Sequence, residues 1–293
     1  MAHSTEVSRA KHKPVLLKES VDALDLQTGE VFIDATYGGG GHSKEVRKRF
    51  PTVEVIAIDQ DPKVEAITAN FKNLDKVVTR KVDAILFDLG FSSDQLGGGV
   101  PGLSFQRDEP LDMRMSGVGI TAADILNSWD ESALELILRG FGEEKFSRKI
   151  ARTIVERRSH FAKASRDKEV KPFKTTFDLV EVVRSVIPHF AKASRGKHPA
   201  TRTFQALRIA VNEELTALEI GLEKGFKALK PNGRLAVISF HSLEDRIVKN
   251  FFRDRVKEKV ARQITKKPIT PSAEEIQNNP RSRSAKLRVI KKL

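Results

Sequence analysis

Four short apolar segments stand out along the chain, and each is rich in β-branched residues and apolar at successive positions. A strand that is buried on both faces has this pattern, as in a parallel sheet covered by helices. The pattern therefore predicts strands at residues 31–36, 53–59, 82–90 and 234–240.

Helical periodicity separates these strands. The clearest case precedes the fourth strand, where apolar residues recur at intervals of three and four and form one stripe: Phe204, Leu207, Val211, Leu215, Leu218, Leu222, Phe226 and Leu229. The stripe predicts one long helix that stops at the Pro-Asn-Gly turn of residues 231–233. Alternating strands and helices predict an α/β fold with a mostly parallel sheet, closed by an edge strand at residues 286–293.

The strand pattern disappears in the middle of the chain, where only helical patterns remain. We therefore predict a sheet domain formed by residues 1–111 and 202–293, interrupted by a helical insertion at residues 112–201. The insertion contains the sequence HFAKASR twice, beginning at His160 and at His189. Two copies are too few for a solenoid, so they indicate a shared basic loop or coincidence.

Charge is distributed unevenly. The net charge is +13 and the pI is about 9.8. Residues 145–202 carry sixteen Lys and Arg against five Asp and Glu, and the chain after Arg246 is similarly basic, whereas the first eighty residues are nearly balanced. A neutral half beside a basic half favours a polyanionic partner.

Several classes of site and location are excluded. The chain has no Cys, which removes disulfides, thiolate nucleophiles and the usual structural zinc sites. Its seven His show no metal-ligand spacing, so no metal is expected. No apolar run approaches the roughly 20 residues of a membrane span, and the N-terminus lacks the apolar core of a signal peptide. We expect a protein of the cytoplasm, or of an organelle matrix in a eukaryote.

A glycine-rich loop follows the first predicted strand, in the sequence VFIDATYGGGGHSKEV. Such a loop opens a helix whose N–H groups face a ligand, and Asp59, at the end of the next strand, is placed to accept the hydroxyls of a ribose. The two features indicate a nucleoside cofactor. A dinucleotide site fits less well, because Ser43 replaces the third glycine of G-x-G-x-x-G counted from Gly38, and no GK[ST] ending marks a phosphate loop. A tight turn without a ligand is the structural alternative.

Eight segments of the chain from His12 onward carry more specific information: FIDATYGGGGHS, AIDQDP, ILFDLGFSSDQL, LSFQRDEPLDMRM, GEEKFSRKIARTIVERR, HPATRTFQALRIAVNEEL, RLAVISFHSLEDRIVKNFF and NPRSRSAKLR. In order and spacing they resemble the S-adenosylmethionine-dependent methyltransferases of the small-subunit ribosomal RNA methyltransferase H family, which modify N4 of a cytosine.

The resemblance implies a Rossmann-like class I methyltransferase sheet with an inserted helical domain that recognises RNA. It implies S-adenosylmethionine as cofactor, and small-subunit ribosomal RNA or the assembling small subunit as partner. The family's cofactor contacts match Gly40, Gly41, His42, Asp59, Phe71, Asp88 and Gln95.

Two departures from the family pattern are visible. Only QDPKVEAITA separates Asp59 from Asn70 and Phe71, where the family usually has a full helix and a further strand. This loss predicts an uncovered sheet edge near the adenine pocket, which weakens cofactor binding or the fold. Phe91 stands where a small aliphatic residue is more usual.

Methylation of a cytosine amino group requires an acceptor for the N–H protons, because the nitrogen lone pair is delocalised into the ring. Asp88, in a DLGF sequence that resembles the Asp-Pro-Pro-Phe/Tyr motif of other amino-group methyltransferases, is the first candidate. Asp112 is the second. His241 either lines the acceptor pocket or precedes a helix-capping box formed by Ser242 to Asp245.

For RNA, the leading phosphate-binding candidates are Arg202, Arg208, Arg281 and Arg283. The last two lie in residues 266–284, which have the composition of an extended, mobile arm. Two alternative functions remain open. One is a ribosome-assembly factor that binds RNA but has lost methyltransferase activity through the shortened segment; the other is a dinucleotide oxidoreductase.

Overall fold

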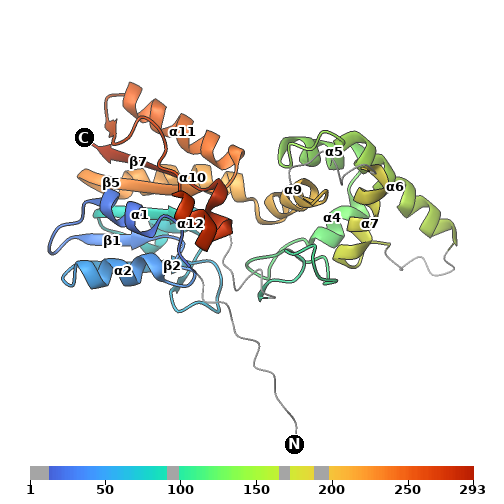
Figure 1. Ribbon diagram of the computed structural model, residues 1–293, viewed down its shortest axis with the longest axis horizontal. Coiled ribbons are helices and arrows are strands. Elements are labelled where there is room, and N and C mark those ends of the chain that lie inside the picture. The colour runs from blue at the N-terminus through green and yellow to red at the C-terminus, as the bar shows by residue number, and fades with distance from the viewer. Residues whose placement is uncertain (1–12, 91–98, 165–171, 188–197) are drawn as a thin grey trace, which may run out of the picture. The chain divides into compact units, whose positions relative to one another are not determined.

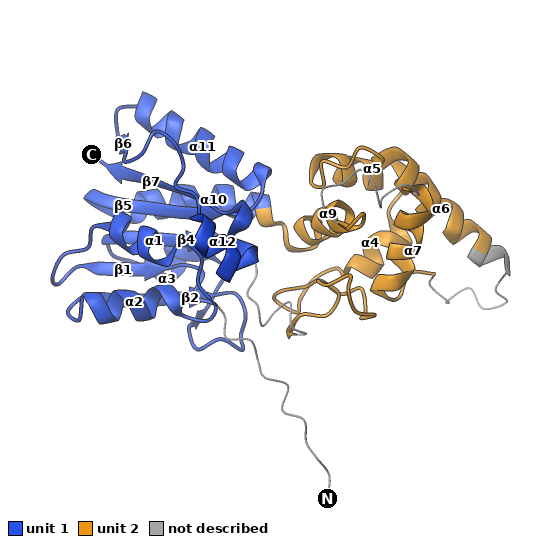
Figure 2. Ribbon diagram, in the orientation of Figure 1, with its two compact units in different colours: residues 1–94, 215–293 blue, residues 95–214 orange. Residues whose placement is uncertain are grey.

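The computed structural model of the protein describes residues 13–90, 99–164, 172–187 and 198–293. The chain forms two compact units (Figure 2). Unit 1 comprises Met1–Asp94 and Leu215–Leu293, and unit 2 comprises Gln95–Glu214.

Within the described residues, seven strands form one sheet in the order β3-β2-β1-β4-β5-β7-β6. Figure 1 labels β1, β2, β5 and β7 of this sheet, together with several of the helices around it. All neighbouring pairs from β3 to β5 are parallel, and β7 is antiparallel to both β5 and β6. The fold is therefore α/β, and the four predicted strands are confirmed. The bounds are β1 Val31–Asp34, β2 Glu54–Asp59, β3 Ile67–Thr68, β4 Val82–Asp88, β5 Leu229–Ser239, β6 Ala261–Gln263 and β7 Lys286–Lys292.

The sequence predicted that the C-terminal strand forms the edge of the sheet, and this prediction is wrong. β7 lies between β5 and β6, and the short β6 forms the edge. Three residues with little apolar periodicity give β6 no signal of its own in the sequence. The chain therefore has to complete β7 before the sheet is closed on this side.

Helices cover both faces of the sheet because alternate strand residues point to opposite faces. In β4, Ile85 and Phe87 pack beneath α3 (Leu74–Val77), α10 (Glu214–Ala228) and α11 (Ser242–Lys257). Ala84 and Leu86 pack on the other face with α1 (Leu17–Leu24) and α2 (Gly41–Arg49). This double cover explains why the strands are apolar at successive positions.

The long helix predicted through Leu229 is wrong. The chain forms α9 (Thr201–Asn212) and α10, separated by Glu213 in the left-handed conformation at φ 50°. α9 packs against α4 and α5 in unit 2, whereas the apolar residues of α10 join the sheet core of unit 1. One apolar stripe thus serves two cores, which moves the predicted boundary at residue 202 to Leu215.

The first boundary also moves, from residue 112 to Gln95, because the segment before residue 112 bonds to unit 2. Leu111 donates its N–H to the carbonyl of Lys174 at 2.9 Å, and Thr176 donates its N–H to the carbonyl of Glu109 at 2.9 Å. These backbone contacts hold the segment against the start of α7.

Unit 2 is helical in its described part, with α4 (Ala122–Ser128), α5 (Glu131–Gly140), α6 (Ser147–Ala164), α7 (Thr176–Val186) and α9. Capping boxes begin α4 at Thr121 and α7 at Thr175. The second copy of the repeat, at His189, lies outside the described residues. Among the helices that the structure describes, none has the length and apolar character that crossing a bilayer requires.

The shortened segment leaves one sheet edge thinly covered, as predicted. No helix occurs between β2 and β3, all of whose residues are described, and β3 has only two residues. Ile67 of β3 is 48% exposed, and the middle of β2 is only partly buried.

The arm predicted at residues 266–284 is not extended. It contains α12 (Ala273–Asn278) and the 3-10 helix η3 (Pro280–Ser284), and the side chain of Ser282 is buried. Ile269 forms an antiparallel bridge with Leu287 of β7. Its Pro, Ser and Asn residues thus serve as helix starts and caps.

Candidate cofactor site

Three acidic residues end neighbouring strands of the sheet: Asp34 ends β1, Asp59 ends β2 and Asp88 ends β4. Because the strands are parallel and adjacent, their carboxyl ends meet at one edge of the sheet, where ligands bind in open α/β folds. The glycine loop follows β1 at the same edge. This edge is the candidate cofactor site.

The glycine loop is shaped by its own protein neighbours. Gly40 lies at φ 69° and ends a turn in which its N–H donates to the carbonyl of Tyr37 at 2.7 Å. A Cβ at Gly40 would lie 2.5 Å from the ring of Tyr37, and a Cβ at Gly41 would lie 2.8 Å from Pro14. The close approach that we assigned to a ligand is thus made, at these two positions, by Tyr37 and Pro14.

Asp59 fastens the loop to β2. Its Oδ2 accepts the N–H of Gly38 at 2.7 Å, and its Oδ1 accepts the N–H of Asp61 at 2.9 Å. Burial raises the pKa of Asp59, and these two hydrogen bonds offset part of the rise. Each carboxylate oxygen has a second acceptor position, so the same group remains able to accept ribose hydroxyls.

Asp88 lies beside His42. His42 Nδ1 is 3.7 Å from Asp88 Oδ2, and His42 Nε2 is 3.2 Å from the carbonyl oxygen of Val15. Within the described residues, Asp88 Oδ1 is buried without a hydrogen-bond partner. Burial, followed by the nearby carboxyls of Asp34 and Glu244, raises the pKa of Asp88 well above its usual value.

Asp34 is a member of the site that sequence reasoning missed. Its side chain is buried, Oδ2 accepts the hydroxyl of Ser43 at 2.6 Å, and Oδ1 has no partner among the described residues. Burial raises the pKa of Asp34 to about 6, although the Ser43 hydroxyl lowers it. Its signal was present in the sequence, as the acid in FIDAT that ends the first strand.

The three carboxyls form a site that suits a cation. Buried carboxylates are costly unless they are paired, and two of these groups present an unpartnered buried oxygen within the part of the chain that the structure describes. S-adenosylmethionine carries a positive sulfonium and a positive ammonium group. The donor set therefore fits this cofactor better than a dinucleotide, whose pyrophosphate these acids would repel.

Phe71 is close to the site by chain connectivity, since Ala69 donates its N–H to the carbonyl of Asp59 at 2.8 Å. Its ring meets Phe87 edge to face, with centroids 5.3 Å apart, and it would lie 2.6 Å from a Cβ at Gly221. Phe71 is thus also part of the core under α10. Gln95 and Phe91 lie outside the described residues.

His241 begins α11 as its N-cap. Its Nδ1 accepts the N–H of Glu244 at 3.4 Å, and Glu244 Oε2 accepts the N–H of Phe240 at 2.8 Å. The capping box is therefore His241 with Glu244, one residue earlier than the sequence predicted. Asp245 instead accepts from Arg288 on β7 at 2.7 Å, which joins α11 to the sheet.

Asp112 belongs to unit 2 and is already paired. Arg114 Nε donates to Asp112 Oδ1 at 2.7 Å, and Arg114 Nη2 donates to Asp112 Oδ2 at 2.8 Å. The hydrogen bonds from Arg114 lower the pKa of Asp112. This two-point ion pair makes Asp112 a weaker candidate for the catalytic acceptor than Asp88.

The four arginine candidates differ in their surroundings. Arg202 is exposed on α9, and Arg281 and Arg283 are exposed on η3. Arg208 forms a two-point ion pair with Glu214, at 2.9 and 3.0 Å, and its side chain is only 12% exposed. Arg208 therefore has a structural partner that a phosphate would have to displace.

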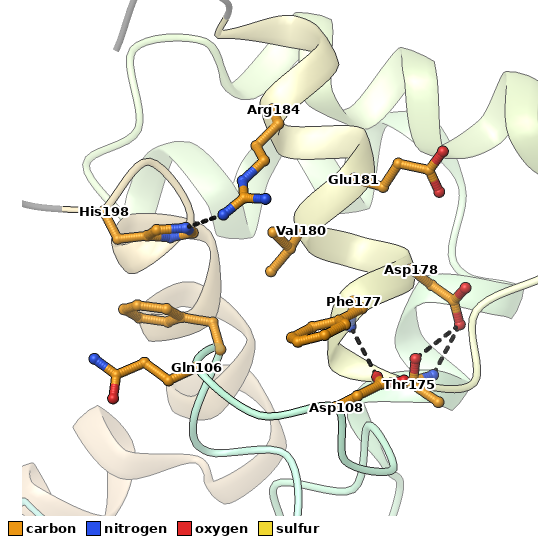
Figure 3. Close-up of a pocket in the computed structure, with 10 residues that line it drawn as sticks. Gln106, Asp108, Thr175, Phe177, Asp178, Val180, Glu181, Arg184 and His198 are labelled. Atoms are coloured by element: carbon orange, nitrogen blue, oxygen red, sulfur yellow. Dashed lines mark hydrogen bonds between the residues drawn. The ribbon is translucent and has the colours of Figure 1, made fainter. Parts of the chain in front are cut away.

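Unit 2 contains a pocket of about 700 Å³. The ring of Phe105 stacks on His198, with centroids 4.5 Å apart, and Arg184 Nη2 lies 3.2 Å from His198 Nε2. Figure 3 shows Arg184 pointing toward His198 from α7, which also carries the half-exposed Phe177. Burial and the charge of Arg184 lower the pKa of His198. A pocket that combines the exposed ring of Phe177 with the guanidinium of Arg184 suits an unstacked nucleobase.

A model of the MraW methylase family matches residues 9–293. The chain belongs to this family. The match spans both units, so the helical unit is part of the family's architecture.

The chain is similar to the ribosomal RNA small subunit methyltransferase H of Carboxydothermus hydrogenoformans, with 45% identity over 96% of this chain and 98% of that protein. It is 43% identical to the protein of the same name from Synechococcus elongatus, over 100% of this chain and 98% of that protein. A solved putative rRNA methylase from Clostridium thermocellum has 13% identity and a TM-score of 0.44, over 96% of this chain and 99% of that one.

The Carboxydothermus alignment spans 317 positions, more than the 293 residues of this chain. That relative therefore has residues that this MraW-family chain lacks.

Proposed function

We infer that this protein transfers the methyl group of S-adenosylmethionine to N4 of a cytosine in small-subunit ribosomal RNA. The observation that carries the inference is the family match over residues 9–293, on a chain whose strand ends present buried acids that fit a cationic cofactor. We expect the protein to act in the compartment where small ribosomal subunits assemble, which is the bacterial cytoplasm or an organelle matrix.

Bound S-adenosylmethionine supplies a methyl group on a positively charged sulfur. In this chain, Asp59 would accept the ribose hydroxyls, and the carboxylates of Asp34 and Asp88 would hold the positive groups. The start of α2 would supply N–H groups for the carboxylate of the cofactor. Phe71 would exclude water from the adenine, and Gln95 is a further proposed contact.

Asp88 is the proposed catalytic residue. An ionised Asp88 accepts a hydrogen bond from the target amino group, which favours the pyramidal amine and stabilises positive charge as it develops. The same carboxylate then accepts one N4 proton, so that the methylated base leaves neutral. His241 and Asp112 are secondary candidates, because each already has a structural role. His241 caps α11, and Asp112 is paired with Arg114.

The direct test is identification of the product. Small-subunit RNA from cells with and without the protein is digested to nucleosides and analysed by mass spectrometry. We expect one cytosine to carry N4-methyl only when the protein is present. A methyl group on ring carbon C5 would contradict the amine mechanism, particularly since the chain has no Cys to act as the nucleophile of that pathway.

One observation favours a second function, that of an RNA-binding assembly factor without methyltransferase activity. The sheet edge beside Asp59 is thinly covered, with Ile67 of β3 48% exposed. Calorimetric titration with S-adenosylmethionine separates the two functions, because an assembly factor of this kind binds RNA and gives no heat with the cofactor.

We expect Asp59→Ala to weaken S-adenosylmethionine binding by about 1.5–3 kcal/mol, since a charged acceptor is lost. Part of this loss comes from the loop, because Gly38 and Asp61 lose their acceptor too. Calorimetry measures the affinity, and chemical unfolding measures the accompanying loss of stability. Equal affinities in variant and wild type would remove Asp59 from the site.

We propose that Arg281 and Arg283 on η3 contact RNA phosphates. Replacing both with Ala should lower RNA affinity and reduce the slope of log K against log salt by about 1.4, since each phosphate contact to a single strand contributes about 0.7. Cofactor affinity without RNA should not change. Arg80→Ala, which removes an exposed Arg paired with Glu54, is the matched control. An unaltered slope in the double variant would show that η3 does not touch RNA.

We propose that the helical unit recognises RNA through its pocket, with a base stacked against Phe177. Phe177 is 47% exposed, so Phe177→Ala should fold normally and weaken binding of a single-stranded ribosomal RNA fragment by about 1–3 kcal/mol. Fluorescence anisotropy measures the affinity. Leu136→Ala, at a 60% exposed position on α5, is the control, and equal losses in both variants would argue against stacking.

A further inference from the structure

The wall of the cofactor site includes a segment that no sequence motif marks. Residues 13–17, here called the strap, run against the glycine loop. Pro14 occupies the space beside Gly41, where a Cβ would lie 2.8 Å from its ring. The carbonyl oxygen of Val15 lies 3.2 Å from His42 Nε2, and His42 Nδ1 faces Asp88 Oδ2 at 3.7 Å. The strap therefore fixes the imidazole that stands beside the catalytic candidate.

The strap is held from the opposite end of the chain. Glu275 on α12 accepts the N–H of Leu16 with Oε1 at 2.8 Å, and Asn279 Nδ2 donates to the carbonyl of Lys13 at 3.2 Å. Leu16 is fully buried and lies at φ 52°. A left-handed conformation is costly for a residue with a Cβ and persists only when its surroundings enforce it. The Glu275 carboxylate is one such constraint.

The same short arm carries the proposed RNA contacts. Asn279 precedes η3, and its carbonyl accepts both the N–H of Ser282 at 2.9 Å and the hydroxyl of Ser282 at 2.8 Å. Ser282 is buried between the exposed Arg281 and Arg283. Asn279 thus bonds to the strap through its side chain and to η3 through its backbone. A displacement of η3 would therefore also displace the group that bonds to the strap.

We propose that Glu275 is a positioning residue for the cofactor site, and that through it the binding of RNA to η3 is coupled to cofactor affinity. The contacts run from Glu275 to Leu16, from Val15 to His42, and from His42 to Asp88. RNA held by η3 restrains α12, and α12 restrains the strap in the conformation that completes the site. Coupling of this kind is reciprocal, so the cofactor also raises RNA affinity. The inference rests on the proposed function.

The experiment measures the affinity for S-adenosylmethionine by calorimetry, with and without purified small-subunit ribosomal RNA. In the wild type we expect RNA to raise cofactor affinity about fivefold or more. Glu275→Ala should bind cofactor roughly tenfold more weakly, because a hydrogen bond to a charged group is lost, and RNA should no longer raise the affinity. A purely structural role of Glu275 would lower the affinity and leave the RNA effect intact.

Three further variants sharpen the test. Glu275→Gln keeps a side-chain oxygen for the Leu16 N–H and should restore most of the affinity and the RNA effect. Glu274→Ala, exposed on the same helix with the same change of charge, should behave as wild type. The Arg281→Ala, Arg283→Ala double variant should keep the affinity measured without RNA and lose the RNA effect.

Two outcomes would overturn the inference, and they are distinguishable from failure of the proposed function. If Glu275→Ala binds cofactor as the wild type does, or if RNA still raises its affinity, Glu275 does not position the site. If the wild type itself binds no S-adenosylmethionine, the proposed function fails and the inference fails with it.

Discussion

Asp88→Asn is expected to lower the rate of methyl transfer by roughly 10²–10³, by analogy with the loss of one preorganised polar group from an active site. Asn keeps an acceptor oxygen and nearly the same shape, so the substitution removes the charge and leaves the packing. Folding should survive, because the backbone N–H of Asp88 still donates to the Thr36 hydroxyl at 2.6 Å and β4 remains paired on both sides.

The pH dependence of the same reaction provides a second signature. The groups that face Asp88 are His42 on α2, Asp34 on β1 and Glu244 on α11, and its pKa is raised by burial and by the two carboxyls. The active form is the ionised one, so the wild-type rate should increase as pH rises through that raised pKa. Asp88→Asn should lose this limb of the profile.

Single-turnover assays at saturating cofactor separate slow chemistry from weak binding. The matched control is Asp83→Asn, which alters an acid at the other end of the same strand, where it pairs with Lys230 at 2.8 Å. A wild-type rate in Asp88→Asn would move the catalytic role to another acid, with Asp112 the next to be tested.

Asp34→Asn is expected to stabilise the protein without cofactor while it weakens cofactor binding. The folded pKa of about 6 lies above the usual 3.8, so the native state holds this proton more tightly than the unfolded chain does. The free energy of unfolding therefore falls as pH rises from about 4 to about 6, and it stays lower above that range. A shift of this size corresponds to about 3 kcal/mol at pH 7, which sets the upper limit of the gain in the variant.

Denaturant unfolding at several pH values measures this effect. The slope between pH 4 and 6 should become shallower in Asp34→Asn, while the part due to Asp59 and Asp88 remains. The new amide must find an acceptor where Oδ1 has none among the described residues, which reduces the gain. An unchanged slope would show that Asp34 does not hold a proton in this range.

The buried carboxyls thus lower the stability of the protein without cofactor, and the same groups are the ones proposed to bind the cofactor. Without a ligand they lie close together at one sheet edge and destabilise the fold when ionised. A cationic ligand should lower their pKa values and recover the lost free energy. Binding should then release protons near pH 6, which calorimetry in buffers of different ionisation enthalpy detects.

The sheet could be predicted from the sequence because its strands are buried on both faces. In β4, residues 84–87 are four consecutive apolar residues, as expected for a strand covered on both faces, and the structure places this strand in the middle of the sheet. β3 and β6 could not be predicted, since each has three residues or fewer, which is too short for an apolar pattern to appear.

The break at Glu213 could not be predicted either. The apolar stripe continues in register through Val211 and Leu215, and Glu is a favourable helix residue with no turn signal. Its left-handed conformation follows from two helices packing on different cores, which is tertiary information. The hydrogen bond between Leu16 and Glu275 could not be predicted for a similar reason, because the two residues are 259 positions apart.

For the site, the glycine loop and the acids at strand ends were visible because strand polarity places them at one edge. Asp34 was not predicted as a site residue because it was interpreted only as part of the first strand, in the sequence FIDAT. The sequence left a ligand and a tight turn as alternative reasons for the glycines, and the structure shows that Tyr37 and Pro14 supply the close contacts at Gly40 and Gly41. Packing partners of this kind cannot be identified before the fold is known.

The position of β7 and α12 in the chain has a consequence for biosynthesis. β7 lies between β5 and β6, and Glu275 accepts the N–H of Leu16 in the strap, which lies against the glycine loop near the N-terminus. A ribosome synthesises the chain from its N-terminus at about 5–20 residues per second, so the glycine loop emerges well before these last elements. The nascent protein therefore has its glycine loop before it has the Glu275 contact that holds the strap, and the Leu16 N–H lacks this acceptor until α12 has been synthesised.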